Sequence, residues 1–219
     1  MSEPNPRYLS RWLVVVAGLL MSGVINAAGS GRLDTFLSGL HSFSADFQQV
    51  LSNEMQQPLE VSTGRVQLTD AGQFYWHYTD PYSQYIISDG EVVWIYDEDL
   101  EQVTINDVGD AVENTPLLIF SGQSQPDEHY LITGLPISDG LEVIELQPRE
   151  TDSQYQKIRF AFAGEVLRFM VLYDALGHIT RIEFSNIRRN PRLDEGLFSF
   201  AAPAGVDVID NRTATGPDG

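Results

Sequence analysis

Acidic side chains are the most numerous groups in this chain that could do chemistry, and four of them lie within residues 97–101. Closely spaced carboxylates can act as general acid and base, or they can bind a hard cation such as calcium. A calcium loop starting at Asp97 would need glycine at its sixth position and glutamate at its twelfth, where this chain has Gln102 and Val108. We therefore predict a solvated hairpin turn here rather than a metal or catalytic site.

Other residues that commonly support catalysis lack a suitable pattern. The four histidines stand alone, with neither an H-x-x-x-H nor an H-E-x-x-H arrangement, and they are His41, His77, His129 and His178. No serine lies in a G-x-S-x-G motif, and no glycine-rich phosphate loop is present. Cysteine is absent, which excludes disulfides, thiol nucleophiles and cysteine-ligated metals. The sequence predicts no catalytic residue, no metal site and no cofactor.

Aromatic side chains supply the one distinctive kind of binding chemistry. Eight of them fall in a stretch of 23 residues that begins at Phe74. Phe74, Trp76 and Tyr78 alternate along an extended run and so project from one face of a strand, and Trp94 and Tyr96 repeat the alternation. We expect both sets on the same face of a sheet, where they either fill a core or line an apolar pocket.

Turn signals and apolar spacing place these residues in a mainly β domain. Asp89-Gly90 between two apolar runs is a strong hairpin signal. Residues 33–40 have the spacing of a short amphipathic helix. The extended runs are 43–51, 59–68, 74–78, 85–87, 92–96, 102–105, 130–133, 141–147, 155–163, 166–173, 179–187 and 198–200. Such strands joined by short turns predict an antiparallel meander that curls toward a barrel.

One short helix is predicted between the strands. Thr115 has the character of an N-cap and Pro116 that of a first helical residue, with residues 117–120 following and Gly122 as the stop. The segment is too short to be stable alone and is apolar on every side. It must therefore lie between two apolar surfaces, one of which could be the aromatic sheet face.

The N-terminus has the order of a secretory signal peptide. Arg7 and Arg11 precede an uncharged run at 12–25, and small residues follow. The apolar run is short of the roughly 20 residues that span a bilayer. We expect cleavage near Ala27 or Ala28.

The expected organisation is a signal peptide at 1–28, one domain at 29–210 and a disordered tail at 211–219. The full chain has a formal net charge of −18, and its leader contributes Glu3, Arg7 and Arg11, so the mature chain carries −19. This charge repels nucleic acid and anionic membranes and suits basic protein partners.

Several motifs occur in a characteristic order along nearly the whole mature chain, from about Phe36 to Val208. They are Phe43-x-Ala45-x-Phe47-x-Gln49, Phe74-x-Trp76, Pro81, Ile87-Ser88-Asp89-Gly90, Val93-Trp94-Ile95-Tyr96-Asp97, Glu101-Gln102, Thr115-Pro116-Leu117-Leu118 and Phe198-x-Phe200-x-x-Pro203-x-Gly205-Val206-Asp207-Val208. Together they closely resemble the periplasmic outer-membrane lipoprotein carrier family, LolA.

The resemblance implies an unclosed antiparallel β-barrel, or half-barrel, with an apolar concave face covered by a lid of short α-helices. It implies a soluble periplasmic carrier, expected to act as a monomer, that takes triacylated lipoproteins from an inner-membrane lipoprotein-releasing ABC transporter to an outer-membrane lipoprotein receptor. The receptor of this pathway is similar in fold but is anchored through an N-terminal cysteine, so the absence of cysteine favours the carrier.

The resemblance also assigns roles to particular residues. The acyl-chain cavity is expected to be lined by Phe43, Phe47, Phe74, Trp76, Ile87, Trp94 and Tyr96. The lid is expected to comprise Pro116, Leu117, Leu118, Ile119 and Phe120.

One position departs from the family pattern. The family usually has an Arg-Pro pair shortly before Phe-x-Trp, and its arginine latches the lid through hydrogen bonds, whereas this chain has Asp70-Ala71. A carboxylate cannot donate hydrogen bonds. We therefore expect an altered latch at Asp70 and a lid held mainly by apolar contacts.

Two other classes of function are alternatives. A periplasmic lipid- or lipopeptide-binding sensor or regulator on the same half-barrel fold would bring a second domain, which the mature length does not accommodate. An acid/base hydrolase would need carboxylates converging inside the apolar face, whereas residues 97–101 are expected at a turn.

We predict that export removes the leader, because its charge, length and small residues suit signal cleavage. The intact mass of protein recovered from the periplasm should correspond to a start near Ala28. A start at Met1 with the protein in the membrane fraction would end the soluble-carrier hypothesis.

Overall fold

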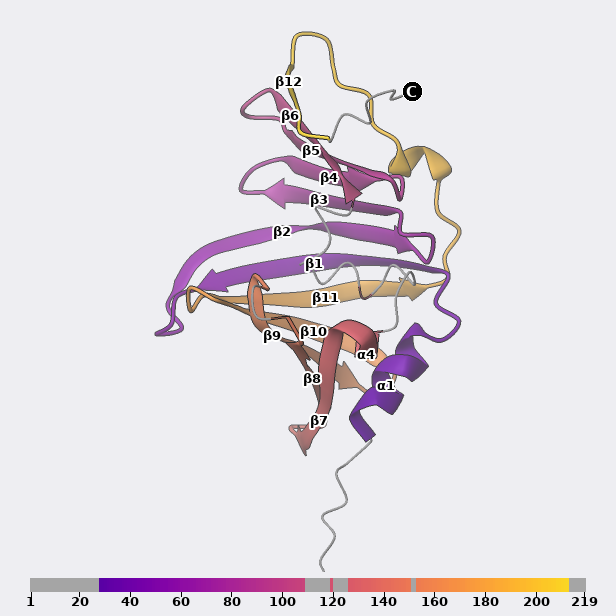
Figure 1. The fold of residues 1–219 in the computed structure, drawn as a ribbon, viewed down its shortest axis with the longest axis vertical. Helices are drawn as coiled ribbons and strands as arrows, with labels where there is room; N and C mark the ends of the chain where they lie inside the picture. Colours follow the sequence, from indigo (N-terminus) through magenta and orange to yellow (C-terminus); the bar gives the residue numbers. More distant parts are fainter. Residues whose placement is uncertain (1–27, 109–118, 120–125, 151–152, 213–219) are drawn as a thin grey trace, which may run out of the picture.

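The computed structural model describes residues 28–108, 119, 126–150 and 153–212. Within these residues the chain forms one twelve-stranded sheet, accompanied by the helices α1 (Ala28–Leu37) and α4 (Pro126–His129) and the 3₁₀ helix η1 (Glu195–Phe198) (Figure 1). The strands are β1 (Ser42–Ser52), β2 (Pro58–Thr69), β3 (Phe74–Asp80), β4 (Gln84–Ser88), β5 (Val92–Asp97), β6 (Gln102–Asp107), β7 (Tyr130–Ser138), β8 (Leu141–Pro148), β9 (Tyr155–Ala163), β10 (Val166–Asp174), β11 (Ile179–Arg189) and β12 (Asp207–Asp210).

The sheet consists of two meanders joined through β1. Its strand order is β12-β6-β5-β4-β3-β2-β1-β11-β10-β9-β8-β7, so β12 and β7 are free edges and the sheet does not close. β1 and β11 pair over their lengths, with Phe43 opposite Arg189 and Ser52 opposite Ile179. Figure 1 shows the lower strands β7–β10 curling away from the plane of the upper ones. The expected mainly β fold and unclosed sheet are confirmed.

Carboxylates close several of the hairpins. The Asp89 side chain accepts hydrogen bonds from the backbone N–H groups of Glu91 and Val92, both at 2.9 Å, and Gly90 has a φ of 102°. Asp97 accepts from the backbone N–H of Leu100 at 3.0 Å. The acidic run at 97–101 therefore forms the turn between β5 and β6, as predicted.

Helix α1 packs on the lower half of the sheet, against β7 and β8. Leu33 and Phe36 of α1 are buried, as the predicted apolar stripe requires. The predicted bounds are wrong, because the helix begins at Ala28 and ends at Leu37, and Leu40 is buried beyond its end. The Phe36 ring lies 5.3 Å from that of Phe162 and 6.3 Å from that of Phe43, between ring centroids. Among the described residues, no helix is long and apolar enough to cross a membrane.

The C-terminal segment differs from the prediction. The prediction of a strand at 198–200 is wrong. The Asp194 side chain accepts a hydrogen bond from the Gly196 N–H and starts the 3₁₀ helix η1, which ends at Phe198. The strand that does form, β12, runs parallel to β6 and was not predicted. Asn211, expected in the disordered tail, donates its backbone N–H to the Ile105 carbonyl at 2.9 Å. Residues 213–219 lie outside the described residues.

Gly64 gives a testable packing constraint. A Cβ atom added there would overlap the His77 carbonyl oxygen and lie 2.7 Å from Cζ of Phe47. We predict that Gly64→Ala destabilises the protein by about 1–3 kcal/mol, as overpacking usually does, measured by urea unfolding. Gly31→Ala is the control, because Gly31 lies in α1 with open space around it. Equal stability of the two variants would contradict this account of Gly64.

Candidate functional site

Four of the predicted cavity residues lie together on one face of the sheet, which we call the inner face. Residues directly opposite each other on paired strands share a face, and Leu68 pairs with Phe43 on one side and Phe74 on the other. Phe43, Phe47, Phe74 and Trp76 are all buried in one cluster that includes the α1 side chains. The Phe47 ring lies 4.5 Å from that of Trp76, between centroids.

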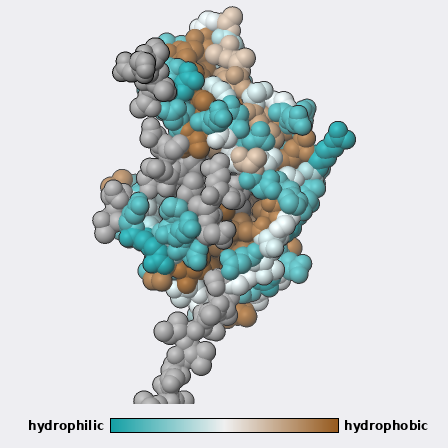
Figure 2. Space-filling model, turned by 45° about the vertical axis from the view of Figure 1, so that its right-hand side comes forward, coloured by the Kyte–Doolittle hydropathy of each residue, from teal (hydrophilic) through white to brown (hydrophobic). Residues whose placement is uncertain are grey.

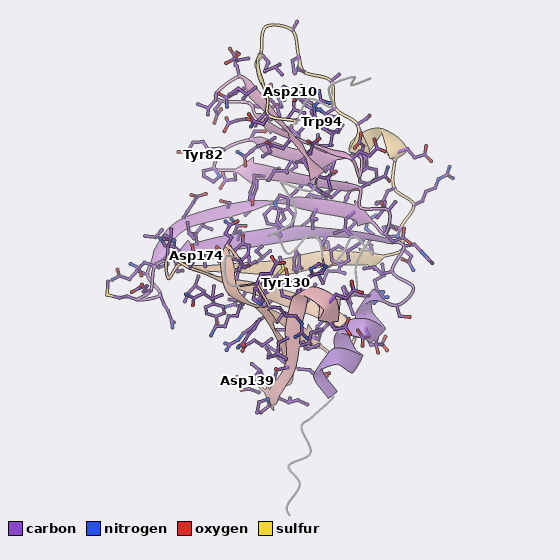
Figure 3. The ribbon with its side chains drawn as sticks, viewed as in Figure 1. Tyr82, Trp94, Tyr130, Asp139, Asp174 and Asp210 are labelled. Atoms are coloured by element: carbon purple, nitrogen blue, oxygen red, sulfur yellow. The ribbon has the colours of Figure 1, made fainter. Side chains whose placement is uncertain are left out.

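The other three predicted cavity residues lie on the opposite, outer face, so the prediction of a shared face is wrong for Ile87, Trp94 and Tyr96. Trp94 pairs with Ile87, and Ile87 pairs with Tyr75, the neighbour of Trp76 in sequence. Because successive strand residues point to opposite faces, this register turns Trp94 away from Trp76. The side-chain view in Figure 3 labels Trp94 in the upper part of the sheet.

On the outer face Tyr96 belongs to a separate aromatic cluster. The Tyr85 ring stacks on His77 at 4.0 Å and lies 5.9 Å from Tyr96, whose ring is 5.4 Å from that of Phe200. Burial lowers the pKa of His77. The 3₁₀ helix η1 lies against β3 and β4. This cluster anchors the C-terminal segment to the back of the sheet.

The inner aromatic set contains a buried polar group for which the described residues supply no well-placed acceptor. Trp76 is 6% exposed, and among the described residues its indole Nε1–H has no acceptor in good hydrogen-bond geometry, although it lies close to Tyr78. The neighbouring Tyr78 hydroxyl donates to Oε1 of Gln49 at 3.2 Å. Burial raises the pKa of Tyr78, and the side chains of Gln49 and Trp76 beside its hydroxyl partly offset the shift. A buried N–H without an acceptor is costly, so an acceptor brought to the inner face would be favoured there.

The altered latch position lies at the margin of the sheet. Asp70 follows β2, its carboxylate Oδ2 lies 2.9 Å from Nδ1 of His41, and its backbone N–H donates to the His41 carbonyl. Arg65 binds Asp46 at 2.8 Å and shares the outer face with His77. Hydrogen bonds from Asn186 and Arg65 lower the pKa of Asp46. Arg65 is therefore no substitute for a latch on the inner face.

One residue of the predicted lid is described. Ile119 is helical and 3% exposed, and it belongs to the same buried cluster as Phe74 and Trp76. Pro116, Leu117, Leu118 and Phe120 lie outside the described residues.

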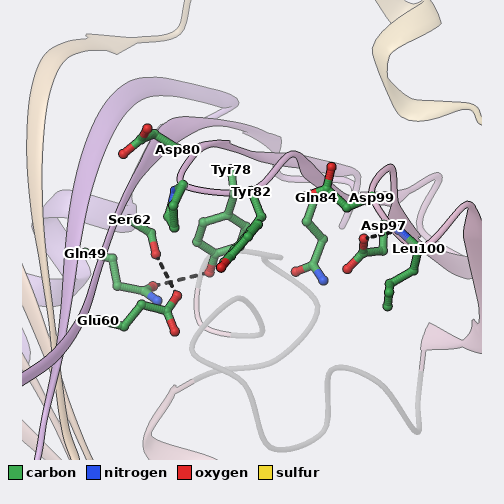
Figure 4. Close-up of a pocket in the computed structure, with 11 residues that line it drawn as sticks. Gln49, Glu60, Ser62, Tyr78, Asp80, Tyr82, Gln84, Asp97, Asp99 and Leu100 are labelled. Atoms are coloured by element: carbon green, nitrogen blue, oxygen red, sulfur yellow. Dashed lines mark hydrogen bonds between the residues drawn. The ribbon is translucent and has the colours of Figure 1, made fainter.

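An acidic pocket of about 450 Å³, which the sequence did not reveal, opens beside Tyr78 (Figure 4). Its lining residues are Gln49, Glu60, Ser62, Tyr78, Asp80, Pro81, Tyr82, Gln84, Asp97, Asp99 and Leu100. Four of them are carboxylates and none is basic. Within the described parts of the chain, no group of three or more potential ligands is placed to hold a metal ion. The pocket therefore presents negative charge and hydrogen-bond acceptors at the end of the apolar inner face.

Comparisons with known proteins agree with this architecture. The chain is 38% identical to an outer-membrane lipoprotein carrier protein of Methylococcus capsulatus, over 92% of this chain and 98% of that one. It is 34% identical to the protein of the same name from Methylobacillus flagellatus, over 93% and 98% of the two chains. A crystal structure of an uncharacterized conserved protein from Thermus thermophilus shares the fold, with a TM-score of 0.50 and 13% identity, over 82% of this chain and 95% of that one.

The family model described as outer membrane lipoprotein carrier protein LolA matches residues 38–201, a span that includes every strand from β1 to β11. The chain belongs to the LolA family of outer-membrane lipoprotein carrier proteins.

Proposed function

We propose that this protein is a periplasmic carrier that binds the acyl chains of lipoproteins on its inner face and delivers them to the outer membrane. The observation that carries the proposal is the aromatic set Phe43, Phe47, Phe74 and Trp76, gathered on one face of an open sheet in a chain whose relatives are named lipoprotein carriers. Carriage itself needs no catalytic group.

The physical need for such a carrier follows from the cargo. Each CH₂ group of an acyl chain costs about 0.8 kcal/mol when it is exposed to water. A triacylated protein therefore needs an apolar container to cross an aqueous compartment. On this proposal the inner face is that container, and the buried Trp76 N–H, for which the described residues supply no well-placed acceptor, can donate to a carbonyl group at the head of the acyl chains.

The container also needs a cover that can be displaced. We propose that residues 116–120 form a lid over the inner face, since Ile119 is buried in the same cluster as Phe74 and Trp76. Asp70 cannot donate hydrogen bonds, and its carboxylate contacts His41. Apolar contacts would then hold the lid, and a lid held in this way can yield to an acyl chain of similar chemistry.

Delivery requires two partners. We propose that an inner-membrane lipoprotein-releasing ABC transporter supplies the cargo and that an outer-membrane lipoprotein receptor accepts it. The net charge of −18 suits basic docking surfaces on both, because complementary charge speeds protein association.

The two faces of the sheet allow a matched test of lipid binding. With Trp94 replaced by phenylalanine, Trp76 is the sole tryptophan of the mature chain. We predict that a diacylated lipopeptide changes the fluorescence of Trp76 saturably. Adding Phe74→Glu should abolish the response, because an acyl chain packed on the inner face would remove water from the carboxylate, which is costly for an unpaired charge.

The control is Trp94→Asp, a similar apolar-to-acidic change on the outer face, which should leave lipopeptide binding intact. Circular dichroism would verify folding. A Trp76 signal that never responds, or binding lost equally in both variants, would count against the inner face as the acyl site.

Ile119 provides a test of the lid. Ile119→Ala removes buried apolar contacts, which typically costs about 2–5 kcal/mol, so the closed lid should become less stable and lipopeptide should enter faster. Stopped-flow measurement of Trp76 fluorescence gives the rate. Ile137→Ala makes the same chemical change at a side chain that is 72% exposed and should have no effect. Unchanged entry in the Ile119 variant would argue against a lid at this position.

A further inference from the structure

The outer face of the lower strands is unusually apolar. In an antiparallel sheet with one face on a core, the other face is commonly polar. Val143, Ala161 and Phe169 nevertheless lie opposite one another on β8, β9 and β10 and point outward. Their sequence neighbours on the same strands, such as Ile144 and Phe160, are buried on the inner face. Figure 2 shows apolar residues reaching the surface in several patches between hydrophilic ones.

These side chains line an open groove of about 800 Å³, which we call the outer groove. Pro58, beside the β1–β2 turn, borders one side of it, and Leu135 and Ser138, beside the β7–β8 turn, border the other. The full lining is Val50, Ser52, Gln56, Pro58, Leu135, Pro136, Ser138, Leu141, Val143, Arg159, Ala161, Phe169, Val171, Tyr173, Ile179 and Arg181. The groove lies on the face opposite to the inner aromatic set, so it is separate from the proposed acyl site.

The charged residues that line the outer groove differ in sign from the net charge of the molecule. The whole chain has 31 acidic residues against 13 basic ones, yet the groove lining contains Arg159 and Arg181 and no carboxylate. Each arginine has an acidic neighbour on the same face: Glu145 binds Arg159 at 2.7 Å, and Glu183, whose side chain is 44% exposed, is 3.9 Å from Arg181. The groove lining is therefore apolar with two arginines, and the carboxylates of Glu145 and Glu183 lie at its margin.

Aromatic rings hold the cations in place. Cζ of the Arg181 guanidinium lies 4.2 Å from the centre of the Phe169 ring. The Arg159 guanidinium donates to the Tyr173 hydroxyl at 3.1 Å, and Nζ of Lys157 lies 4.5 Å from the centre of that ring. A stacked guanidinium loses little freedom when it binds a carboxylate through two hydrogen bonds. The Arg181 side chain is still 54% exposed, so its donors can reach a ligand.

We propose that the outer groove docks an extended segment of a partner protein that carries apolar side chains flanked by carboxylates. The apolar side chains would lie along Val143, Phe169 and Val171, and a carboxylate would pair with Arg181. A lipid bilayer fits less well, because a chain with a net charge of −18 is repelled by an anionic membrane. The inference does not depend on lipoprotein carriage.

The test uses the mature chain and a fluorescein-labelled peptide, acetyl-Glu-Phe-Pro-Leu-Glu-Phe-amide, with binding followed by fluorescence anisotropy and by amide chemical shifts. The largest shifts should map to β9, β10 and β11. Arg181→Glu should weaken binding about tenfold or more, as expected for loss of a charged hydrogen-bonded pair. Arg192→Glu makes the same charge change at an exposed residue outside the groove and should leave binding unchanged.

A second variant tests the apolar contacts. Phe169→Ser should weaken binding while leaving the circular dichroism spectrum unaltered, because its side chain is only partly buried. The proposal is overturned if the peptide fails to bind, if its shifts lie elsewhere, or if a peptide with lysine in place of glutamate binds equally well. It is also overturned if phosphatidylglycerol vesicles, rather than the peptide, perturb the groove.

Discussion

The pairing of β1 with β11 is the contact on which the rest of the structure depends. β1 lies between β2 and β11 and is the only described strand that joins the two meanders. The Asn190 side chain caps this pairing by accepting from the backbone N–H of Ser42, 148 positions away in sequence. Bringing together two strands so far apart in sequence costs conformational entropy. Burial of Phe43, Phe47 and Phe184 along the β1–β11 pairing offsets that cost. Without the β1–β11 pairing, each meander would have two open edges and only half of the inner face.

The pairing of β1 with β11 also positions the inner aromatic side chains. Phe47 projects from β1 over Gly64 of β2 and reaches the Trp76 ring. A residue with a side chain at position 64 would displace this ring, so one glycine makes room for the aromatic set. Helix α1 fills the inner face over the lower strands, and Ile119 meets the same cluster. The proposed acyl site is therefore an extension of the hydrophobic core rather than a separate cavity.

Charge is distributed unevenly between the two sides of the sheet. The acidic pocket near Tyr78 and the basic outer groove lie on different faces, and each is lined by charged groups of one sign. A strongly acidic protein that keeps two arginines over aromatic rings in one groove has two chemically distinct surfaces.

Local sequence was sufficient for much of this structure. Alternation located most strands, and Asp89-Gly90 marked the β4–β5 turn. The spacing of Leu33 and Phe36 indicated a helix in the region of α1, and the ordered motifs indicated the family. These features depend on residues close in sequence, where backbone preferences and side-chain periodicity act directly. Tertiary structure alone decided that Trp94 and Tyr96 face away from Trp76, that β12 runs parallel to β6, and that Glu60 shares a pocket with Asp97. The physical reason is the register between strands. Alternation determines which residues of one strand share a face, but a shift of one residue between paired strands reverses the face on which they lie. Turn geometry and burial across the whole sheet set that register.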